Sequence, residues 1–187
     1  MVTELDKNTA LVLIDLQKGI TQMPVAKPVS DILANAARLA AAFRKAALPV
    51  VVVNVNPAGA AHTKTRKDAK PRPGMAFTAE SMEIVPEIRT EPGDIFITKH
   101  TWSAFFETAL HEELKKRNVT GIVLAGISTS IGVEGTARSA SELGYNITFA
   151  TDAMTDMSAD SHENSLKHIF PRLGEADDTD KIIAMLS

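Results

Sequence analysis

Residues 10–14 read Ala-Leu-Val-Leu-Ile, an unbroken apolar run that ends at Asp15. A strand buried on both faces of a parallel sheet has this pattern, because helices cover both of its sides. Similar runs follow at Val50–Val55 and Gly121–Ala125. We therefore expect an α/β fold built around a parallel sheet.

Helix-length segments separate the apolar runs, which is the alternation typical of strand–helix–strand units. In residues 30–47, apolar side chains recur at three- and four-residue spacings behind Ser30, a good N-cap. Helices are predicted over residues 30–47, 108–117, 132–143, 160–170 and 179–186. Strands are predicted over residues 10–14, 50–55, 95–98, 121–125, 145–150 and 172–175.

The chain has 187 residues, 44% of them hydrophobic, and a formal net charge of −3. This length predicts one folded domain over residues 1–187. The slightly acidic balance argues against nucleic acid and an anionic membrane as partners. The chain contains no cysteine, which removes disulfides, thiolate metal ligands and cysteine nucleophiles together. Neither a signal peptide nor a membrane-spanning run is visible, so we expect a cytoplasmic protein.

A long segment, residues 56–84, shows neither helical nor strand periodicity and contains several prolines and glycines. Long loops in compact domains are usually functional. Residues 62–72 hold five basic side chains and one aspartate, a net charge of +4. This concentration of charge suits an anionic small-molecule substrate. A solvated charge run explains it equally well.

Three polar features lie at the carboxyl ends of predicted strands: Asp15, Lys99 and the small-residue turn 126–132. Ligands bind at this edge of open α/β sheets. An aspartate and a lysine that share the edge most simply neutralise each other, either as a functional pair or as a structural one. The turn opens a helix, whose N–H groups suit an anion or a developing oxyanion. Close packing of its glycines on the sheet is the alternative.

Three linked motifs give the chain a recognisable pattern: LVLIDLQ at residues 11–17, KHTWSAFFETAL at residues 99–110, and residues 123–153, which begin VLAGISTSIG. In this order and over nearly the whole length, the chain resembles the isochorismatase-like hydrolase superfamily. This superfamily, also called the cysteine hydrolase family, includes nicotinamidases and N-carbamoylsarcosine amidohydrolase.

The resemblance implies a three-layer α/β/α, Rossmann-like fold with a six-stranded, mainly parallel sheet. Asp15 and Lys99 fall on the family's catalytic aspartate and lysine, and Gly132 falls on the position of its cysteine nucleophile. The resemblance also implies a cis peptide bond between Ile127 and Ser128. That bond would direct the N–H groups of Ser128 and Gly132 into an oxyanion hole. A homo-oligomer, either a dimer or a tetramer, is implied as well.

Glycine at position 132 rules out thioester chemistry, which needs a thiolate. Ser130 is a poor substitute, because nothing in the sequence places its hydroxyl beside a base. True isochorismatases resemble this chain in carrying glycine at this position. Their substrate is a vinyl ether, which an acid protonates before water adds. Asp15 would be that acid, Lys99 would bind the substrate's carboxylates and position Asp15, and Gly132 would leave room for the enolpyruvyl group.

The remaining candidates are substrate-binding residues: Ser128, Asn56, Arg66, Trp102 and Phe105. The resemblance places Asn56 after the second strand as a polar ligand contact, and Arg66 is the nearest loop arginine. Trp102 and Phe105 are candidate pocket walls, although some aromatic side chains of this stretch must be core. Isochorismatases tend to carry a bulky ring where this chain has Ser128 and a histidine where it has Ser130.

No metal site and no cofactor are expected. Nicotinamidases bind their metal through an Asp-x-His pattern after the second strand, whereas this chain has Asn-Val-Asn-Pro at residues 54–57. Two alternatives to a vinyl-ether hydrolase remain. One is a catalytically silent member that binds a ligand or partner, and the other is a former amidase that has lost its cysteine.

Overall fold

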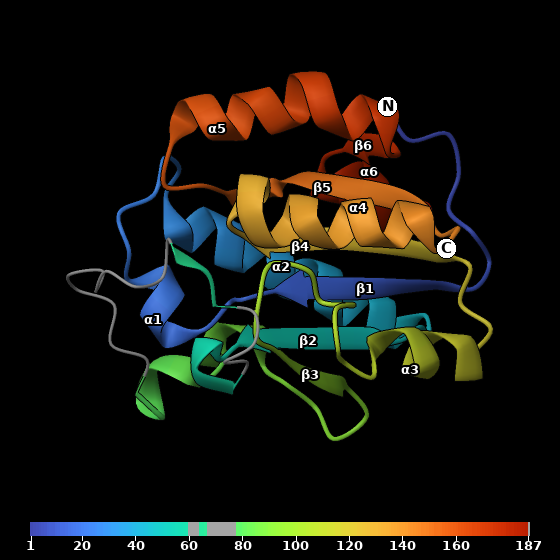
Figure 1. The fold of residues 1–187 in the computed structure, drawn as a ribbon. Coiled ribbons are helices and arrows are strands. Elements are labelled where there is room, and N and C mark those ends of the chain that lie inside the picture. The colour runs from blue at the N-terminus through green and yellow to red at the C-terminus, as the bar shows by residue number, and fades with distance from the viewer. Residues whose placement is uncertain (60–63, 67–77, 187) are drawn as a thin grey trace.

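The computed structural model describes residues 1–59, 64–66 and 78–186, which form a central sheet covered by helices (Figure 1). The strands pair in the order β3-β2-β1-β4-β5-β6, and every neighbouring pair is parallel. They are β1 (Thr9–Ile14), β2 (Val50–Val55), β3 (Ile95–Lys99), β4 (Gly121–Ile127), β5 (Asn146–Thr155) and β6 (Glu175–Asp177). The predicted α/β fold with a six-stranded sheet is confirmed.

Helices cover both faces of the sheet and form the outer two layers of the fold (Figure 1). They are α1 (Lys18–Thr21), α2 (Val29–Lys45), α3 (Leu110–Lys116), α4 (Glu134–Glu142), α5 (Ala159–Asn164) and α6 (Thr179–Ala184). One apolar cluster joins the sheet to α3 and α4, and a second joins its other face to α2 and α6. Among the described residues, no helix is both long and apolar enough to cross a bilayer.

Strand β1 lies at the centre of the sheet, between β2 and β4. Its residues are all buried. Val12 and Ile14 point into the cluster under α3 and α4, whereas Leu11 and Leu13 point into the cluster under α2. Because both faces of β1 are covered, apolar side chains are favourable at every position of the strand. This burial explains the unbroken apolar run at residues 10–14.

Several boundaries differ from the sequence prediction. Strands β4 and β5 are longer than predicted, and the sixth strand is Glu175–Asp177 instead of residues 172–175. This three-residue edge strand carries two acidic side chains, so it has no apolar pattern to detect. The predicted helix 160–170 does not stop at Pro171, because a 3₁₀ turn, Phe170–Arg172, continues it. Proline fits there, because the N–H groups of the first residues of a helical turn have no acceptor within the turn, and proline lacks only that N–H.

Candidate active site

Asp15 and Lys99 meet at the carboxyl edge of the sheet. Asp15 directly follows β1, and Lys99 is the last residue of β3. The side chain of Lys99 spans the end of β2, which lies between these strands, and its Nζ is 2.8 Å from Oδ2 of Asp15. Asp15 has a φ of 52°, in the left-handed region that few non-glycine residues adopt. Strain of this kind clusters at functional sites.

The ammonium group of Lys99 has all its donors occupied. Besides the ion pair, Nζ donates hydrogen bonds to the backbone oxygens of Thr101 at 3.1 Å and Trp102 at 3.0 Å. An ammonium carries three N–H groups, so these three acceptors can use all of them. Lys99 thus fixes the position of Asp15. That Lys99 also binds the substrate's carboxylates stays a prediction.

The carboxyl group of Asp15 is a strong candidate for an acid. The residue is only 5% exposed, and burial raises its pKa to about 6 even though the charge and hydrogen bond of Lys99 lower it. Its second oxygen, Oδ1, is buried and has no hydrogen-bond partner among the described residues. Since Oδ2 accepts from the ammonium, the proton of the neutral acid belongs on Oδ1. Asp15 therefore has one oxygen held by Lys99 and one available for a ligand.

Gly132 borders this pair directly. A Cβ atom built on Gly132 would lie 3.3 Å from Oδ2 of Asp15, 3.3 Å from Nζ of Lys99 and 2.8 Å from Cγ2 of Ile14. Real Cβ atoms do not approach a methyl group that closely, because the two atoms would overlap. The site is thus shaped around the absence of a side chain at this position.

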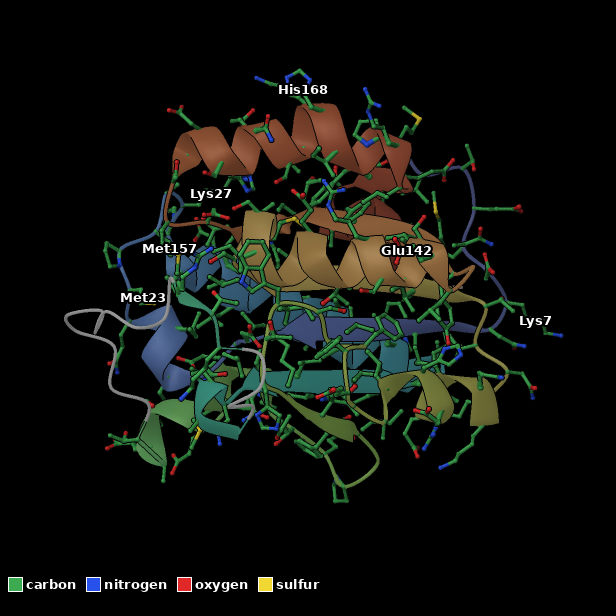
Figure 2. The ribbon with its side chains drawn as sticks, in the orientation of Figure 1. Lys7, Met23, Lys27, Glu142, Met157 and His168 are labelled. Carbon is green, nitrogen blue, oxygen red and sulfur yellow. The ribbon has the colours of Figure 1, made fainter. Side chains whose placement is uncertain are left out.

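Strand β4 brings the turn to the pair through a close backbone approach. Gly126 has a φ of 127°, and a Cβ there would lie 2.1 Å from the carbonyl oxygen of Ile14. Only glycine fits such a position. The second peptide bond after Gly126, between Ile127 and Ser128, is cis. Ser128 is buried, and its hydroxyl donates to Sδ of Met157 at 3.1 Å. Figure 2 shows Met157 at the end of the molecule opposite Lys7.

Asn56 lies at the same edge, next to Lys99. Its N–H donates to the Lys99 carbonyl at 2.9 Å, and its own carbonyl accepts from Nδ1 of His100 at 2.6 Å. The side-chain oxygen of Asn56 accepts from the N–H of Ala58 at 3.1 Å. The backbone carbonyl of Trp102 accepts a hydrogen bond from Lys99, but Trp102 as a whole is 55% exposed. Asn56 and Trp102 thus contact Lys99 through backbone atoms, whereas the side chain of Ser128 contacts Met157.

Two predicted ligand contacts have no contact with the pair among the described residues. The ring of Phe105 stacks on Tyr145, with centroids 5.6 Å apart, and packs on the core under α3 and α4. Tyr145 precedes β5, at the amino end of that strand, so the described contacts of Phe105 are with the core, and its role as a pocket wall stays a prediction. Arg66 is exposed and is described only with residues 64 and 65. Most of the basic stretch 62–72 lies outside the described residues, so its role stays a prediction.

One contributor was missed from the sequence. Gln17 is fully buried, and its amide both donates to the carbonyl of Val55 at 3.2 Å and accepts from the N–H of Val55 at 2.8 Å. It also donates to the carbonyl of Ser81 at 3.2 Å. Gln17 therefore fixes the end of β2 relative to Asp15. A polar side chain in an otherwise apolar motif, two residues after Asp15, was the feature of the sequence that could have indicated this role.

Comparison with known proteins identifies the family of this chain. The model of the isochorismatase domain matches residues 9–181. YwoC of Bacillus subtilis (strain 168), an uncharacterised isochorismatase family protein, is 42% identical over 179 residues, which cover 95% of this chain and 93% of YwoC. YecD of Escherichia coli O157:H7, also an uncharacterised isochorismatase family protein, is 39% identical over 182 residues, which cover 96% of this chain and 97% of YecD.

A solved structure extends the comparison to three dimensions. The structure of an isochorismatase family protein from Burkholderia thailandensis superposes with a TM-score of 0.92 at 39% identity, and the match covers 100% of this chain and 99% of that one. Together, the domain match, the full-length relatives and the shared fold show that this chain belongs to the isochorismatase family of hydrolases.

Proposed function

We propose that this hydrolase uses Asp15 as a general acid on a small anionic, cyclic substrate, with water as the nucleophile and isochorismate as the leading candidate. The observation that carries the proposal is the state of Asp15. Its buried carboxyl has a pKa raised to about 6, and one of its oxygens, Oδ1, has no hydrogen-bond partner in the part of the chain that the structure describes. It lies beside a glycine in a chain without cysteine. An acid is thus available where no thiol nucleophile exists.

The proposed reaction is the hydrolysis of a vinyl ether. Asp15 gives the proton on Oδ1 to the substrate's methylene carbon, which leaves an oxocarbenium ion and the Asp15 carboxylate. Water adds to the cationic carbon and returns a proton to the carboxylate, and the resulting hemiketal collapses to pyruvate and a dihydroxylated cyclohexadiene acid. Lys99 holds Oδ2 and stabilises the carboxylate during this cycle.

The proposal also assigns the residues that bind the substrate. Gly132 leaves room for the enolpyruvyl group, and the N–H groups of Ser128 and Gly132 form the proposed oxyanion hole. Asn56 and Trp102 contribute from the ends of β2 and β3. Three described acceptors already surround the ammonium of Lys99, so we propose Arg66 in the loop as a second cation for the substrate's carboxylates.

Pyruvate release from isochorismate tests this function, and its pH dependence tests the acid. With a pKa of about 6, Asp15 is protonated in about half of the molecules at pH 6, a tenth at pH 7 and a hundredth at pH 8. We therefore expect kcat/KM to fall about tenfold per pH unit above pH 7. The substrate's carboxylates are ionised throughout this range, so the decrease of kcat/KM above pH 7 would report the titration of a group on the enzyme. No pyruvate from the wild type, or a rate that is flat from pH 6 to pH 9, contradicts the proposal.

The geometry disfavours a former amidase that has merely lost its cysteine. Cγ2 of Ile14 occupies the space that a Cβ at position 132 needs. We expect Gly132→Cys alone to show no amidase activity and to lower the free energy of unfolding by about 1–3 kcal/mol, because the added side chain overpacks the site. The cost of Gly132→Cys should be smaller in an Ile14→Ala background than in the wild type, because the two side chains compete for the same space.

Urea unfolding and an assay of ammonia release from small amides measure these two effects. The matched control is Gly93→Cys, since a Cβ on Gly93 would have no atom of the described residues within 4 Å. Efficient amide hydrolysis by the single Gly132→Cys variant would favour the former amidase over the vinyl-ether hydrolase.

Three broader properties belong to the proposal as well. We propose that residues 1–187 form one domain, that the protein assembles into a homo-oligomer, and that it works in the cytoplasm on a small molecule. Light scattering of the purified protein tests the assembly, and a monomer would contradict it.

A further inference from the structure

A second carboxylate, Asp156, lies next to the turn that carries Gly132. Strands β4 and β5 run side by side to their ends, where Ile127 pairs with Thr155. Asp156 directly follows, and it is only 3% exposed. It therefore lies beside the cis peptide and the start of the turn Thr129–Val133, although sequence reasoning gave it no role.

Asp156 binds the turn through paired hydrogen bonds. Its Oδ2 accepts both from the N–H of Ser130 at 2.7 Å and from the hydroxyl of Ser130 at 2.8 Å. Its Oδ1 accepts from the N–H of Ser158 at 3.3 Å, and its carbonyl accepts from the N–H of Ala26 at 2.8 Å. Hydrogen bonds to a carboxylate are short and about twice as strong as neutral ones. The turn is thus tied to the end of β5 by a buried charge.

A neighbouring contact acts in the same direction. Oγ1 of Thr129 lies 2.8 Å from Nδ1 of His162, and both residues are buried. Two consecutive turn residues, Thr129 and Ser130, are therefore held by the segment that follows β5. Two residues further along the turn, Gly132 borders Asp15 and Lys99.

We infer that Asp156 is a positioning residue, which holds the turn so that Ser128 and Gly132 stand at the Asp15–Lys99 pair. Asp156 acts through Ser130 and does not touch the acid itself. A loss of Asp156 frees the N–H and the hydroxyl of Ser130 together, so the turn becomes mobile next to the reacting atoms. Displacements of about 1 Å in such a frame cost about 100-fold in rate.

The chain offers a matched control on the same strand. Oδ1 of Asp152 accepts from the N–H of Thr179 at 2.9 Å and from its hydroxyl at 2.7 Å. This is the same pattern of bonds, but it holds the start of α6 instead of the turn. Asp152→Ala therefore removes a similar pair of bonds elsewhere in the fold, together with the hydrogen bond that Nδ2 of Asn35 donates to Oδ2 of Asp152 at 3.1 Å.

Hydrogen exchange of the full chain tests the positioning role without any substrate. We expect Asp156→Ala to speed exchange in residues 126–134 by at least about tenfold, with β1 and β2 unchanged. Asp152→Ala should leave residues 126–134 within about twofold of wild type and speed exchange near α6. Ser130→Ala, which keeps the backbone bond, should have a smaller effect than Asp156→Ala. If Asp156→Ala does not fold, Asp156→Asn replaces it, since it keeps the volume and removes the charge.

Kinetics give a second readout, which rests on the proposed function. We expect Asp156→Ala to lower kcat for pyruvate release about 10- to 100-fold, with KM within about threefold, and Asp152→Ala to leave both near wild type. Exchange at the turn that is unchanged, or that rises equally throughout the chain, overturns the inference. If the wild type releases no pyruvate, the proposed function fails, and the exchange measurement still decides the role of Asp156.

Discussion

Asp15→Asn is expected to lower kcat for pyruvate release about 1000-fold, within the range of 10² to 10⁴ that general acids contribute. Asparagine has nearly the same shape, and its amide oxygen can still accept from Lys99. It has no acidic proton to give to a methylene carbon, so the first step of the proposed reaction loses its donor. KM should change little, because Asp15 acts in the transition state and not in binding.

The control for this variant is Asp94→Asn. The carboxylate of Asp94 is also nearly buried, and it pairs with Arg44 at 2.7 Å in the turn before β3, away from the site. Both variants break a shielded ion pair, so comparable losses of stability are expected in thermal unfolding. Only Asp15→Asn should lose activity. Retention of more than about a tenth of the wild-type kcat would exclude Asp15 as the acid.

The sequence predicted the fold well because burial controls the pattern of the strands. Residues 10–14 are apolar throughout since β1 lies between two covered faces, and this pattern needs no knowledge of the neighbouring strands. The shared carboxyl edge of parallel strands then placed Asp15 and Lys99 together, and the structure has them 2.8 Å apart. The protonation state of Asp15 could not be predicted from the sequence. Burial and Lys99 shift its pKa in opposite directions, and only the structure shows that burial is stronger.

Contacts that depend on irregular backbone were not predictable. The segment 100–109 has no helical or strand period, so the sequence did not distinguish exposed Trp102 from Phe105, which packs on the core. The carbonyls that occupy Lys99 belong to the same segment. The contact between Asp156 and Ser130 depends on a β5 that runs to Thr155, with a shift of register beside Gly126. Short-range patterns do not encode such a shift.

Lys99→Met is expected to lower the free energy of unfolding by about 3–5 kcal/mol at pH 8, the usual cost of removing one partner from a buried ion pair. The charge and the hydrogen bond of Lys99 both lower the pKa of Asp15, so without them the pKa should rise above its wild-type value of about 6. A native pKa that is raised above the unfolded value stabilises at low pH, and this contribution is lost as pH rises through the native pKa.

The stability deficit of Lys99→Met relative to wild type should therefore grow from pH 5, where Asp15 is neutral in both proteins, to pH 8, where the variant holds an unpaired buried charge or must take up a proton. Urea unfolding at the two pH values measures this difference. Lys116→Met is the control, because Lys116 forms an exposed pair with Glu113 and should change stability by less than about 1 kcal/mol. The alkaline limb of any residual activity should move to higher pH in Lys99→Met. An equal deficit at both pH values, or a limb that moves to lower pH, would mean that Lys99 does not control the proton on Asp15.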